Sequence, residues 1–487
     1  MRRRLYNSPV LDRRTLLSSI AAVCAGGASG NAASANPLHV SVATEARRVA
    51  GRGAVLRLLA PHGCEANVWP VIKAFEAATG VRVELREVPV DEINAQLTLD
   101  SLSGDGDYDL ALPATFGIPD LAAGGIIRPI TSFARQYEPE GFRDGVLYST
   151  GDSFDGEVYG FQADGDTYVM FYHREWLEDA AKRARYEDRY GTPLAIPSTW
   201  DELDRQMAFF HSPEEGRYGG ALFRTPGYLA WEWWVRFHAK GVWPLSADLE
   251  PQIASDEGVA ALEDMIRATE MLYPQARSAG LFDNWAHYGE GNTYCNIGWG
   301  GSQKYLNGPQ SRMRGRMVYG PTPTGSFGGL EVAMPYFNWG WSYVVASISK
   351  QPELAYLFAL FASTSEMSTL AIREQDGYFD PFRPEHYADP VIVETYSPEF
   401  LAVHEASLRA SIPDLYLANQ GAYFRALSEW LDEAVNRGAD PRKSLERAAT
   451  QWSVLSLRAG REKQRKRWMA LRAKYPAAAQ AALRDVL

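Results

Sequence analysis

The chain has 487 residues and a formal net charge of −11, with 46% hydrophobic and 22% charged residues. A single hydrophobic core stops growing at about 250–300 residues, so this length predicts two lobes, and the composition excludes wholesale disorder. The acidic balance argues against general binding to nucleic acid or to an anionic membrane surface.

The first 35 residues resemble an export signal. An arginine-rich start is followed by the weakly apolar run 16–23 and by the small-residue cleavage pattern Ala33-Ser34-Ala35. Asp12-Arg13-Arg14-Thr15-Leu16-Leu17 resembles the twin-arginine export motif, with an ordinary secretory signal as the alternative. No later apolar run reaches the ~18–20 residues needed to span a membrane. We therefore expect a soluble mature protein in the periplasm.

Two cysteines, Cys64 and Cys295, remain after such cleavage. An oxidising compartment permits a disulfide between them, but sequence alone does not establish a pair. Two unconnected buried thiols are the preferred interpretation.

Residues 55–112 alternate between strand and helix patterns, which predicts a parallel α/β sheet with right-handed crossovers. The expected strands cover 55–60, 81–85 and 108–112, and the expected helices cover 68–79 and 93–102. Ligands of such sheets bind beyond the carboxyl ends of the strands, which points to His62, Glu65 and Phe116. For His62, a loop histidine with satisfied hydrogen bonds is the alternative.

The stretch 156–176 predicts a crossover between two lobes. Asp164 and Asp166 flank Gly165, which lets the backbone bend freely so that polar side chains can converge. The apolar run 168–172 lacks polar alternation, which is typical of a strand buried on both faces. We place the two carboxylates at the cleft, with an Asx turn before a core strand as the alternative.

Further along, Thr199 and Glu202 predict a capping box at a helix start, which is a structural feature. The Pro/Gly/Thr-rich loop 321–329 is a second candidate crossing between lobes. The tail from residue 417 onward is expected to be helical, and its segment 458–468 is strongly basic. A solvated helix face is the default interpretation of that segment, and docking to an acidic patch on this chain or on a partner is the sharper one.

Aromatic residues recur where a ligand could be held. Trp231 and Trp234 share one helix face while Trp233 points elsewhere, so one set can pack the core and another can line a cavity. Residues 293–302 predict a strand that opens into a glycine-rich turn with one exposed indole, Trp299; the turn could cradle an anion if a helix follows. Segment 336–341 leads into a strand at 342–348. Indole rings suit carbohydrate because the C–H faces of sugars are apolar while their rims carry hydroxyls.

Nothing in the sequence supports a nucleophilic site or a cofactor. It has no Gly-x-Ser-x-Gly elbow, His-Glu-x-x-His pair, Cys-x-x-Cys pair or phosphate-binding glycine loop, and its histidines are too scattered for a dedicated metal site. Asp164 and Asp166 could form an acid/base pair for glycoside chemistry. Adjacent carboxylates around one glycine do not oppose each other across a substrate, so we do not expect an enzyme.

Residues from about 54 to 390 resemble the family 1 extracellular solute-binding proteins, the maltose-binding-protein-like receptors of ABC importers. The matching segments are 75–83, 108–110, 121–130, 156–161 with 171–173, and 197–203. The turn Gly298-Trp299-Gly300-Gly301 lacks the proline-tryptophan of the maltose receptor, and the basic C-terminal extension has no counterpart that we recognise.

The resemblance implies an α/β, two-lobe periplasmic binding protein fold in which each lobe is a mostly parallel sheet flanked by helices. Crossover strands would form the hinge. The implied division assigns 36–160 and 316–365 to the N-terminal lobe, 161–315 and 366–455 to the C-terminal lobe, and 456–487 to a basic helical tail.

The implied function is a monomeric periplasmic binding protein that captures a sugar or polyol and delivers it to an ABC permease, without a cofactor and without nucleic acid. The expected ligand contacts are His62, Glu65, Phe116, Asp164, Asp166, Tyr228, Trp231, Trp233, Trp299, Asn338, Trp339 and Trp341. Two rivals stay open. One is a binding protein for a charged solute, either a polyamine or a glycerol phosphate, of which the phosphate would need Arg224 or a helix N-terminus. The other is a secreted carbohydrate-active enzyme.

Overall fold

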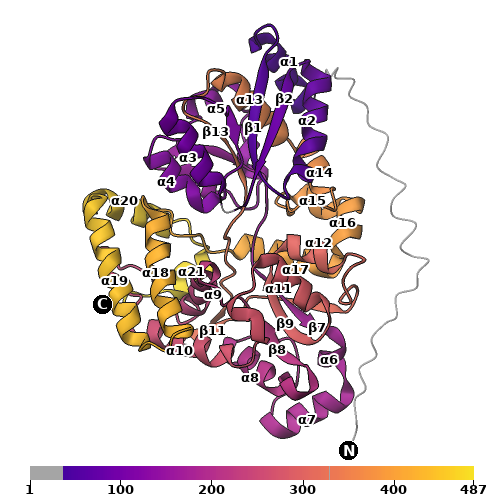
Figure 1. The fold of residues 1–487 in the computed structure, drawn as a ribbon, viewed down its shortest axis with the longest axis vertical. Helices are drawn as coiled ribbons and strands as arrows, with labels where there is room; N and C mark the ends of the chain where they lie inside the picture. The colour runs from indigo at the N-terminus through magenta and orange to yellow at the C-terminus, as the bar shows by residue number, and fades with distance from the viewer. Residues whose placement is uncertain (1–36, 91, 328–329, 487) are drawn as a thin grey trace, which may run out of the picture. The chain divides into compact units, whose positions relative to one another are not determined.

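The computed structural model describes residues 37–90, 92–327 and 330–486. The predicted export signal lies outside the described residues. Residues Leu38–Leu487 form one compact unit that contains two separate larger β-sheets (Figure 1). Within the described part of the chain no single helix is long and apolar enough to cross a membrane. Two consecutive helices, α13 (Pro352–Ala362) and α14 (Ser365–Ile372), are bent by 69° relative to each other. They reach the length and apolar composition of a membrane span only when they are taken together.

The first sheet contains the strand–helix alternation predicted for residues 55–112. Its strand order is β2-β1-β3-β13-β6. The strands are β1 (Val55–Pro61), β2 (Arg82–Val88), β3 (Leu110–Ala111), β6 (Gly160–Gln162) and β13 (Ser342–Val345). Helices α1 (Leu38–Val49), α2 (Glu65–Thr79) and α3 (Ile93–Ser103) lie around this sheet (Figure 1). Gly80, with φ +74°, ends α2 in the left-handed conformation that glycine adopts without steric cost.

The second sheet is centred on the predicted buried strand. Its order is β10-β7-β9-β8, formed by β7 (Val169–His173), β8 (Tyr218–Ala221), β9 (Thr293–Gly298) and β10 (Met317–Pro321). Every residue of β7 is buried, as the absence of polar alternation predicted. Helices α8 (Trp200–Phe210), α11 (Leu281–Gly289) and α17 (Pro398–Ala410) pack against this sheet.

The two sheets are mixed rather than mostly parallel, which corrects the expectation. In the first sheet β1 pairs in parallel with β2 and β3, but β13 is antiparallel to both β3 and β6. In the second sheet only β8 and β9 are parallel to each other. The reason is that β13 returns from the other sheet through a crossing segment, and no strand–helix–strand unit fixes its direction.

Two crossing segments connect the sheets and run antiparallel to each other. Residues 163–168 lead from β6 to β7, as predicted, and residues 333–341 lead back to β13. The Ala163 N–H donates to the Trp341 carbonyl at 2.8 Å, and the Tyr168 N–H donates to the Tyr336 carbonyl at 3.1 Å. A third segment, around Asp380, joins them because the Gly165 N–H donates to its carbonyl at 3.2 Å.

Two expectations about the return crossing are wrong. The described part of the predicted loop 321–329, residues 321–327, does not cross between sheets but enters the hairpin of β11 (Gly325–Phe327) and β12 (Leu330–Val332). β10 begins at Met317 and pairs with β7 in the second sheet, so the return placed at residue 316 comes later in the chain. The other expected lobe boundaries stay a prediction.

The remaining helices fall into two groups, one that forms a layer beside the second sheet and one that belongs to the connections. The helix layer beside the second sheet comprises α9 (Pro226–His238), α10 (Asp256–Thr269), α18 (Gln420–Val435), α19 (Pro441–Arg458), α20 (Arg461–Arg472) and α21 (Ala477–Ala482). The other helices and short strands are η1 (Thr115–Gly117), α4 (Ile118–Ala123), α5 (Thr131–Tyr137), η2 (Phe142–Gly145), η3 (Thr150–Asp152), β4 (Ser153–Phe154), β5 (Glu157–Val158), α6 (Arg174–Glu178), α7 (Ala180–Tyr190), η4 (Pro213–Glu215), η5 (Pro274–Arg277), α12 (Gly300–Leu306), α15 (Pro384–Ala388) and α16 (Pro390–Tyr396).

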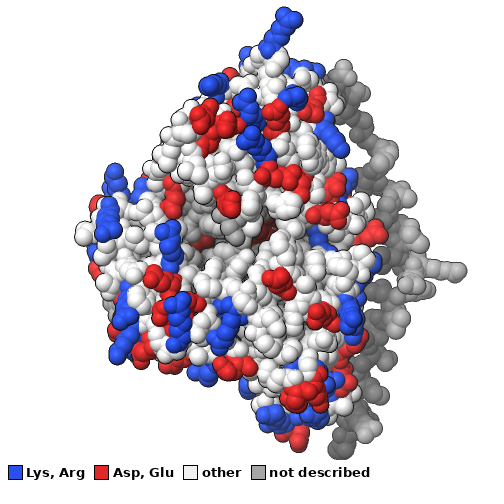
Figure 2. Space-filling view, in the orientation of Figure 1, with Lys and Arg blue, Asp and Glu red and all other residues white. Residues whose placement is uncertain are grey.

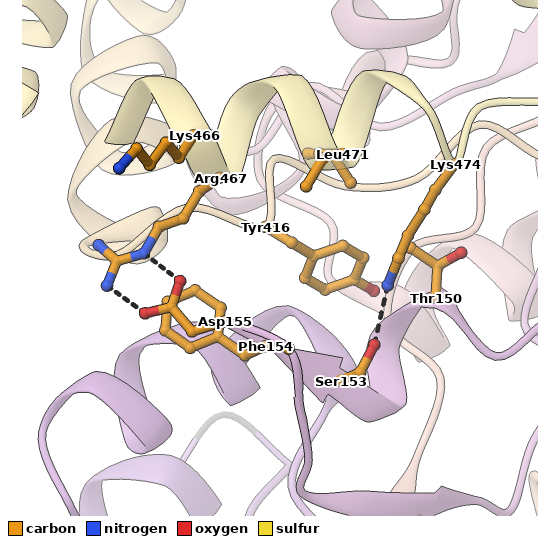
Figure 3. Close-up of a pocket in the computed structure, with 11 residues that line it drawn as sticks. Thr150, Ser153, Phe154, Asp155, Tyr416, Lys466, Arg467, Leu471 and Lys474 are labelled. Carbon is orange, nitrogen blue, oxygen red and sulfur yellow. Dashed lines mark hydrogen bonds and ion pairs between the residues drawn. The ribbon is translucent and has the colours of Figure 1, made fainter. Parts of the chain in front are cut away.

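The basic segment of the tail docks on this chain through one part of its surface, while Arg458, Lys463 and Lys466 stay exposed, as the solvated-face interpretation expects. Trp468 of α20 is fully buried and donates its Nε1–H to the Ser246 carbonyl at 2.9 Å. From the preceding position on the helix, Arg467 forms an ion pair with Asp155 in the turn between β4 and β5 (Figure 3). Arg461 of the same segment pairs with Glu250, so two acidic groups of this chain bind the basic segment.

Replacing Thr199 by alanine is expected to cost about 1 kcal/mol of stability, because it removes the capping box that begins α8. The Thr199 hydroxyl accepts the Glu202 N–H at 3.2 Å, and the Glu202 carboxylate accepts the Thr199 N–H at 3.4 Å. Urea unfolding measures the loss. Thr450→Ala, at an exposed position inside α19, is the control. Equal unfolding midpoints for the two variants would contradict the capping role.

Candidate functional site

Two adjoining cavities lie on either side of Trp339, in the region where the crossing segments meet. The larger has a volume of about 730 Å³ and the smaller about 40 Å³, and Trp339 and Val90 line both. The surface is hollowed near the middle of the face seen in Figure 2, with acidic side chains visible inside the hollow.

The larger cavity combines aromatic rings with polar side chains. Phe116 reaches it from η1, directly after β3 of the first sheet, and Trp231 reaches it from α9. The Trp231 and Trp339 rings meet edge to face, with centroids 5.0 Å apart. The polar lining includes Asn94, Asp414, Gln420, Arg425 and Glu429. Apolar platforms with a few placed polar groups are typical of small-molecule sites.

The smaller cavity is an aromatic cage with one carboxylate. Its lining includes Trp285, Trp299, Trp339, Trp341, Phe282 and Tyr378 together with Asp166. Asn338 holds one wall of the cage, because its Oδ1 accepts the Nε1–H of Trp299 at 3.0 Å.

The Trp339 backbone is strained. Its φ is +72°, in a region where a bulky side chain is rare, and Gly340 follows with φ +53°. The Thr115 N–H holds this conformation by donating to the Trp339 carbonyl at 2.9 Å. The Trp339 Nε1–H is buried without a hydrogen-bond partner among the described residues. Such strain costs about 1–3 kcal/mol and clusters at functional sites, which supports Trp339 as a binding residue.

Three buried carboxylates, from Asp164, Asp166 and Asp380, converge behind the cage. Each offers an oxygen atom within 4.8 Å of those of the others. Backbone N–H groups satisfy one oxygen of each: Asp380 donates to Asp164 at 2.6 Å, Gly340 to Asp166 at 3.3 Å, and Gly300 to Asp380 at 2.7 Å. Burial raises the pKa of Asp164 and of Asp166 well above the usual value, and the neighbouring carboxylates raise both further.

The Gly300-Gly301-Ser302 turn already holds an anion from this chain. A helix, α12, does follow the turn, as the anion-cradle hypothesis required. The Asp380 carboxylate occupies its first turn, however, by accepting the Gly300 N–H. The turn is therefore filled by a residue of this chain and is not open to an anionic solute.

Asp414 differs from the three carboxylates behind the cage because it lines the larger cavity. It is buried, its Oδ1 accepts the Leu415 N–H at 2.7 Å, and the side chains of Tyr336 and Gln420 are hydrogen-bonded to the carboxyl group. Burial raises the pKa of Asp414 to about 7. A carboxyl group at a cavity wall can accept a hydrogen bond from a hydroxyl group or donate one to it.

The structure brings together most of the predicted site residues. Phe116, Trp231 and Trp339 line the larger cavity, and Asp166, Trp299, Trp339 and Trp341 line the smaller one. Tyr228 packs edge to face on Trp231, with centroids 5.1 Å apart. Asn338 and Asp164 lie immediately behind the lining. Trp299 was expected to be exposed, but it is 4% exposed because it packs against Tyr168 and Asn338.

Besides Tyr228, Asn338 and Asp164, three more predicted contacts line neither cavity, and these three lie farther from the site. Trp233 is fully buried and stacks on Phe237 with centroids 4.7 Å apart, so it belongs to the core of the second sheet's helix layer. The His62 side chain is 73% exposed and pairs with Glu87 at 3.3 Å. Glu65 accepts the N–H of Gly63 at 2.5 Å, at the start of α2. The rule about strand ends located the correct edge of the sheet but not these side-chain directions.

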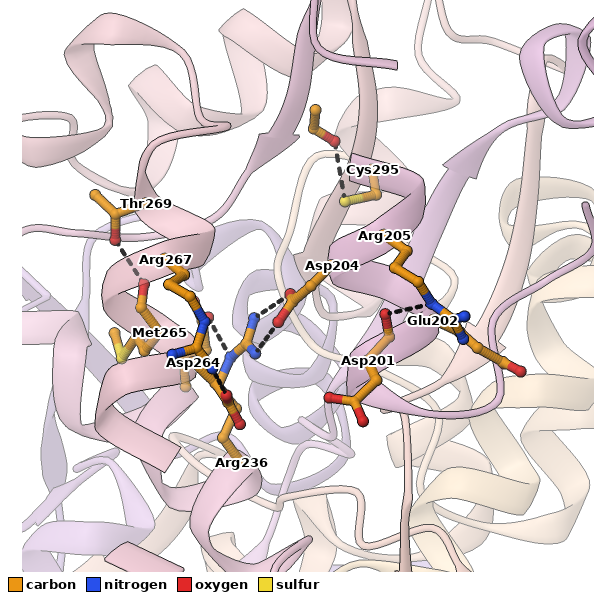
Figure 4. A network of polar contacts seen from close by, with 12 residues as sticks. Asp201, Glu202, Asp204, Arg205, Arg236, Asp264, Met265, Arg267, Thr269 and Cys295 are labelled. Carbon is orange, nitrogen blue, oxygen red and sulfur yellow. Dashed lines mark hydrogen bonds and ion pairs between the residues drawn. The ribbon is translucent and has the colours of Figure 1, made fainter. Parts of the chain in front are cut away.

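Arg224 is committed to a buried ion-pair network and cannot serve a phosphate. It donates to both oxygens of Glu232, at 2.5 and 3.1 Å, and Glu232 also accepts from Arg236 at 2.9 Å. Arg236 in turn donates to both oxygens of Asp204 at 3.0 Å (Figure 4). Burial alone would raise the pKa of Glu232, but the charges of Arg224 and Arg236 outweigh it and hold that pKa below the usual value.

Sequence reasoning missed several lining residues. Asn94, Asp414 and Gln420 line the larger cavity, and Trp285 and Tyr378 line the smaller one. None of them stands in a local motif, and they come from separate elements. Tyr378 stands in an aromatic, proline-containing segment, 377–384, but nothing local in that segment indicates that it reaches the cage.

Comparison with known proteins gives one family and several relatives. The family model described as bacterial extracellular solute-binding protein matches residues 71–397. A probable amino-acid ABC transporter periplasmic-binding protein of Sinorhizobium fredii is 24% identical, covering 73% of this chain and 78% of that protein. An erythritol/L-threitol-binding protein of Mycolicibacterium smegmatis is 21% identical, covering 68% of this chain and 71% of that protein.

Solved structures show a similar fold. An ABC transporter solute-binding protein of Agrobacterium radiobacter K84 in complex with ribitol has a TM-score of 0.70 at 17% identity, covering 83% of this chain and 99% of that one. Maltose-bound MalE3 of T. maritima has a TM-score of 0.69 at 18% identity, covering 82% of this chain and 100% of that one. At these identities the likeness is one of fold alone.

Proposed function

Since the chain belongs to the bacterial extracellular solute-binding proteins, with the two-lobe fold of its structural neighbours, we propose that it captures a sugar or polyol in the cavities around Trp339. It would then deliver that solute to an ABC permease. One observation carries the proposal: Phe116, Trp231 and Trp339 surround a cavity of about 730 Å³ whose wall also presents Asn94, Asp414 and Gln420.

The chemistry of this wall suits a neutral, hydroxyl-rich solute. Indole and phenyl faces pack against apolar C–H groups, while amide and carboxyl side chains exchange hydrogen bonds with hydroxyls. The cavity volume falls within the range of ordinary small-molecule sites. Relatives that bind erythritol or L-threitol, ribitol and maltose support the same solute class.

Binding would draw on both halves of the fold. Phe116 follows a strand of the first sheet, and Trp231 lies on a helix of the layer beside the second sheet. A ligand that contacts both stabilises the arrangement in which both reach it, which is how such proteins close on a solute. We place the protein in the periplasm as a monomer after export. The curated relatives are binding proteins rather than enzymes.

The test is a melting-temperature series on the purified protein with erythritol, L-threitol, ribitol, mannitol, sorbitol, glucose and maltose. A bound solute at about 100 times its dissociation constant stabilises the fold by about 2.7 kcal/mol. We expect a concentration-dependent rise with at least one sugar or polyol. Turnover of the bound compound, or no rise with any of them, would overturn the proposal.

Trp339→Gly locates the binding site. Glycine tolerates the positive φ at this position, so the variant removes the indole without adding backbone strain. We expect about tenfold weaker binding, equivalent to ~1.4 kcal/mol. Trp430→Ala removes a partly exposed indole of α18 that lines neither cavity, and its affinity should equal that of the wild type.

A further inference from the structure

The carboxylates behind the cage lack the direct ion pairs that the buried Glu232 has, although the charge of Lys304 acts on Asp164 and Asp380. Glu232 is 2% exposed and lies between two arginines. Asp164 and Asp380 are fully buried and Asp166 is 8% exposed, yet none of them forms an ion pair with a lysine, arginine or histidine of the described chain. Burying an acid without a partner is unfavourable unless it keeps a proton or meets a cation.

The ammonium group of Lys304, whose charge acts on Asp380 and Asp164, is already used in hydrogen bonds. It donates to three backbone carbonyls, those of Glu374, Gly377 and Phe379, at 2.9, 2.9 and 3.0 Å. An ammonium group has three protons, so none is left for a carboxylate. Asp164 Oδ2 is buried and receives no N–H or hydroxyl donor among the described residues, and the Asp164 side chain is hydrogen-bonded to that of Asp166. Asp166 is the member of the cluster that lines the small cavity, and it forms no ion pair with a lysine or arginine among the described residues.

The small cavity that Asp166 lines is the aromatic cage. Trp299, Trp339 and Trp341 surround the small cavity that Asp166 also lines. The faces of indole rings carry negative potential and attract cations that are weakly hydrated, and they do so best when water is excluded. A hard metal ion prefers several oxygen ligands, whereas most of this lining is ring carbon. The geometry thus favours an organic ammonium over a metal ion.

We infer that the solute carries a protonated or alkylated amine, which occupies the aromatic cage beside Asp166 while the hydroxylated remainder lies in the larger cavity. This inference rests on the proposed function and narrows its solute class to amino sugars, amino polyols and similar hydroxylated amines. Trp339 separates the two cavities, so its indole would contact the ammonium group on one side and the hydroxylated part on the other.

Matched ligand pairs test the inference by calorimetry or thermal shift. The pairs are sorbitol with D-glucamine, glucose with glucosamine, and choline with its neutral carbon isostere. N-acetylglucosamine controls for the added substituent, since it keeps the nitrogen but not the charge. We expect the charged member to bind at least about tenfold more tightly, the range that a desolvated cation–π contact supplies. Calcium chloride alone probes for a metal ion.

Asp166→Asn keeps the shape of the side chain and removes its charge. The variant should fold as stably as the wild type, because it relieves an unpaired buried acid, and it should lose the preference for the charged member of each pair. Glu290→Gln makes the same charge change at an exposed position at the end of α11, the helix that carries Trp285, and should keep the preference.

The outcomes separate this inference from the proposed function. Equal or tighter binding of the neutral member, or a preference that survives in Asp166→Asn, would overturn the amine while leaving the sugar or polyol function standing. Stabilisation by calcium chloride alone would show that the site binds a metal ion and would overturn the amine. Failure of every compound in both panels to bind would overturn the proposed function itself.

Discussion

Glu232→Gln is expected to lower the free energy of unfolding by about 3–5 kcal/mol, the usual cost of breaking a buried ion pair from one side. Glu232 accepts from Arg224 at 2.5 Å and from Arg236 at 2.9 Å, and all three side chains are buried. The amide would leave Arg224 without a counter-charge in the interior, while Arg236 would keep Asp204. Chemical denaturation of the ligand-free protein measures the loss.

Glu175→Gln is the matched control for this prediction. It also removes a carboxylate from an arginine, Arg316, in the region of the second sheet, but its side chain is 58% exposed. Solvent screens such a pair, so only a small change is expected. Similar unfolding midpoints for the two variants would show that the buried network does not stabilise the fold. The Glu232 pKa is lowered in the folded state, so its stabilisation is complete above the ordinary glutamate pKa and is lost as the pH falls through the lowered value.

The parts of the fold that sequence predicted are those fixed by neighbouring residues. Gly80 at the end of α2, the Thr199 capping box and the uninterrupted apolar run of β7 each depend on a few consecutive positions. The direction of β13 and β10 depends instead on where the chain goes between distant strands. A local pattern carries no information about that path, which is why mixed sheets appeared where parallel ones were expected.

The residues of the candidate site also divide into those that the local sequence predicts and those that it does not. Helical periodicity correctly separated Trp231 from Trp233, but it could not say which of them faces the cavity. Asp166 was found because it stands in the crossing segment itself. Asp380 and Asp414 were missed because they reach the site from loops more than 200 residues further along the chain, and only tertiary packing brings them there.

Arg467→Ala is expected to destabilise the contact between α20 and the β4–β5 hairpin. Arg467 contacts both oxygens of Asp155 and lies 4.8 Å from the centre of the Phe154 ring. Just beyond the end of α20, Lys474 also reaches this hairpin and donates to the Ser153 hydroxyl at 2.8 Å. The next residue after Arg467, Trp468, is buried in the helix layer beside the second sheet. We expect a loss of about 1–2 kcal/mol, from one partly buried ion pair and one cation–π contact.

A double-mutant cycle with Asp155→Asn isolates the ion pair from this total. Asp155 and Gly156 both have positive φ, at 51° and 81°, as a two-residue hairpin turn of this kind requires, and asparagine tolerates that conformation. Because the Asp155 side chain is 44% exposed, the coupling should be modest, about 0.5–1 kcal/mol. Arg465→Ala removes an arginine that pairs only with Glu462 of the same helix, and it should leave stability unchanged. Zero coupling would mean that α20 is held by Trp468 and its apolar neighbours alone, and that the basic residues facing the hairpin contribute only solubility.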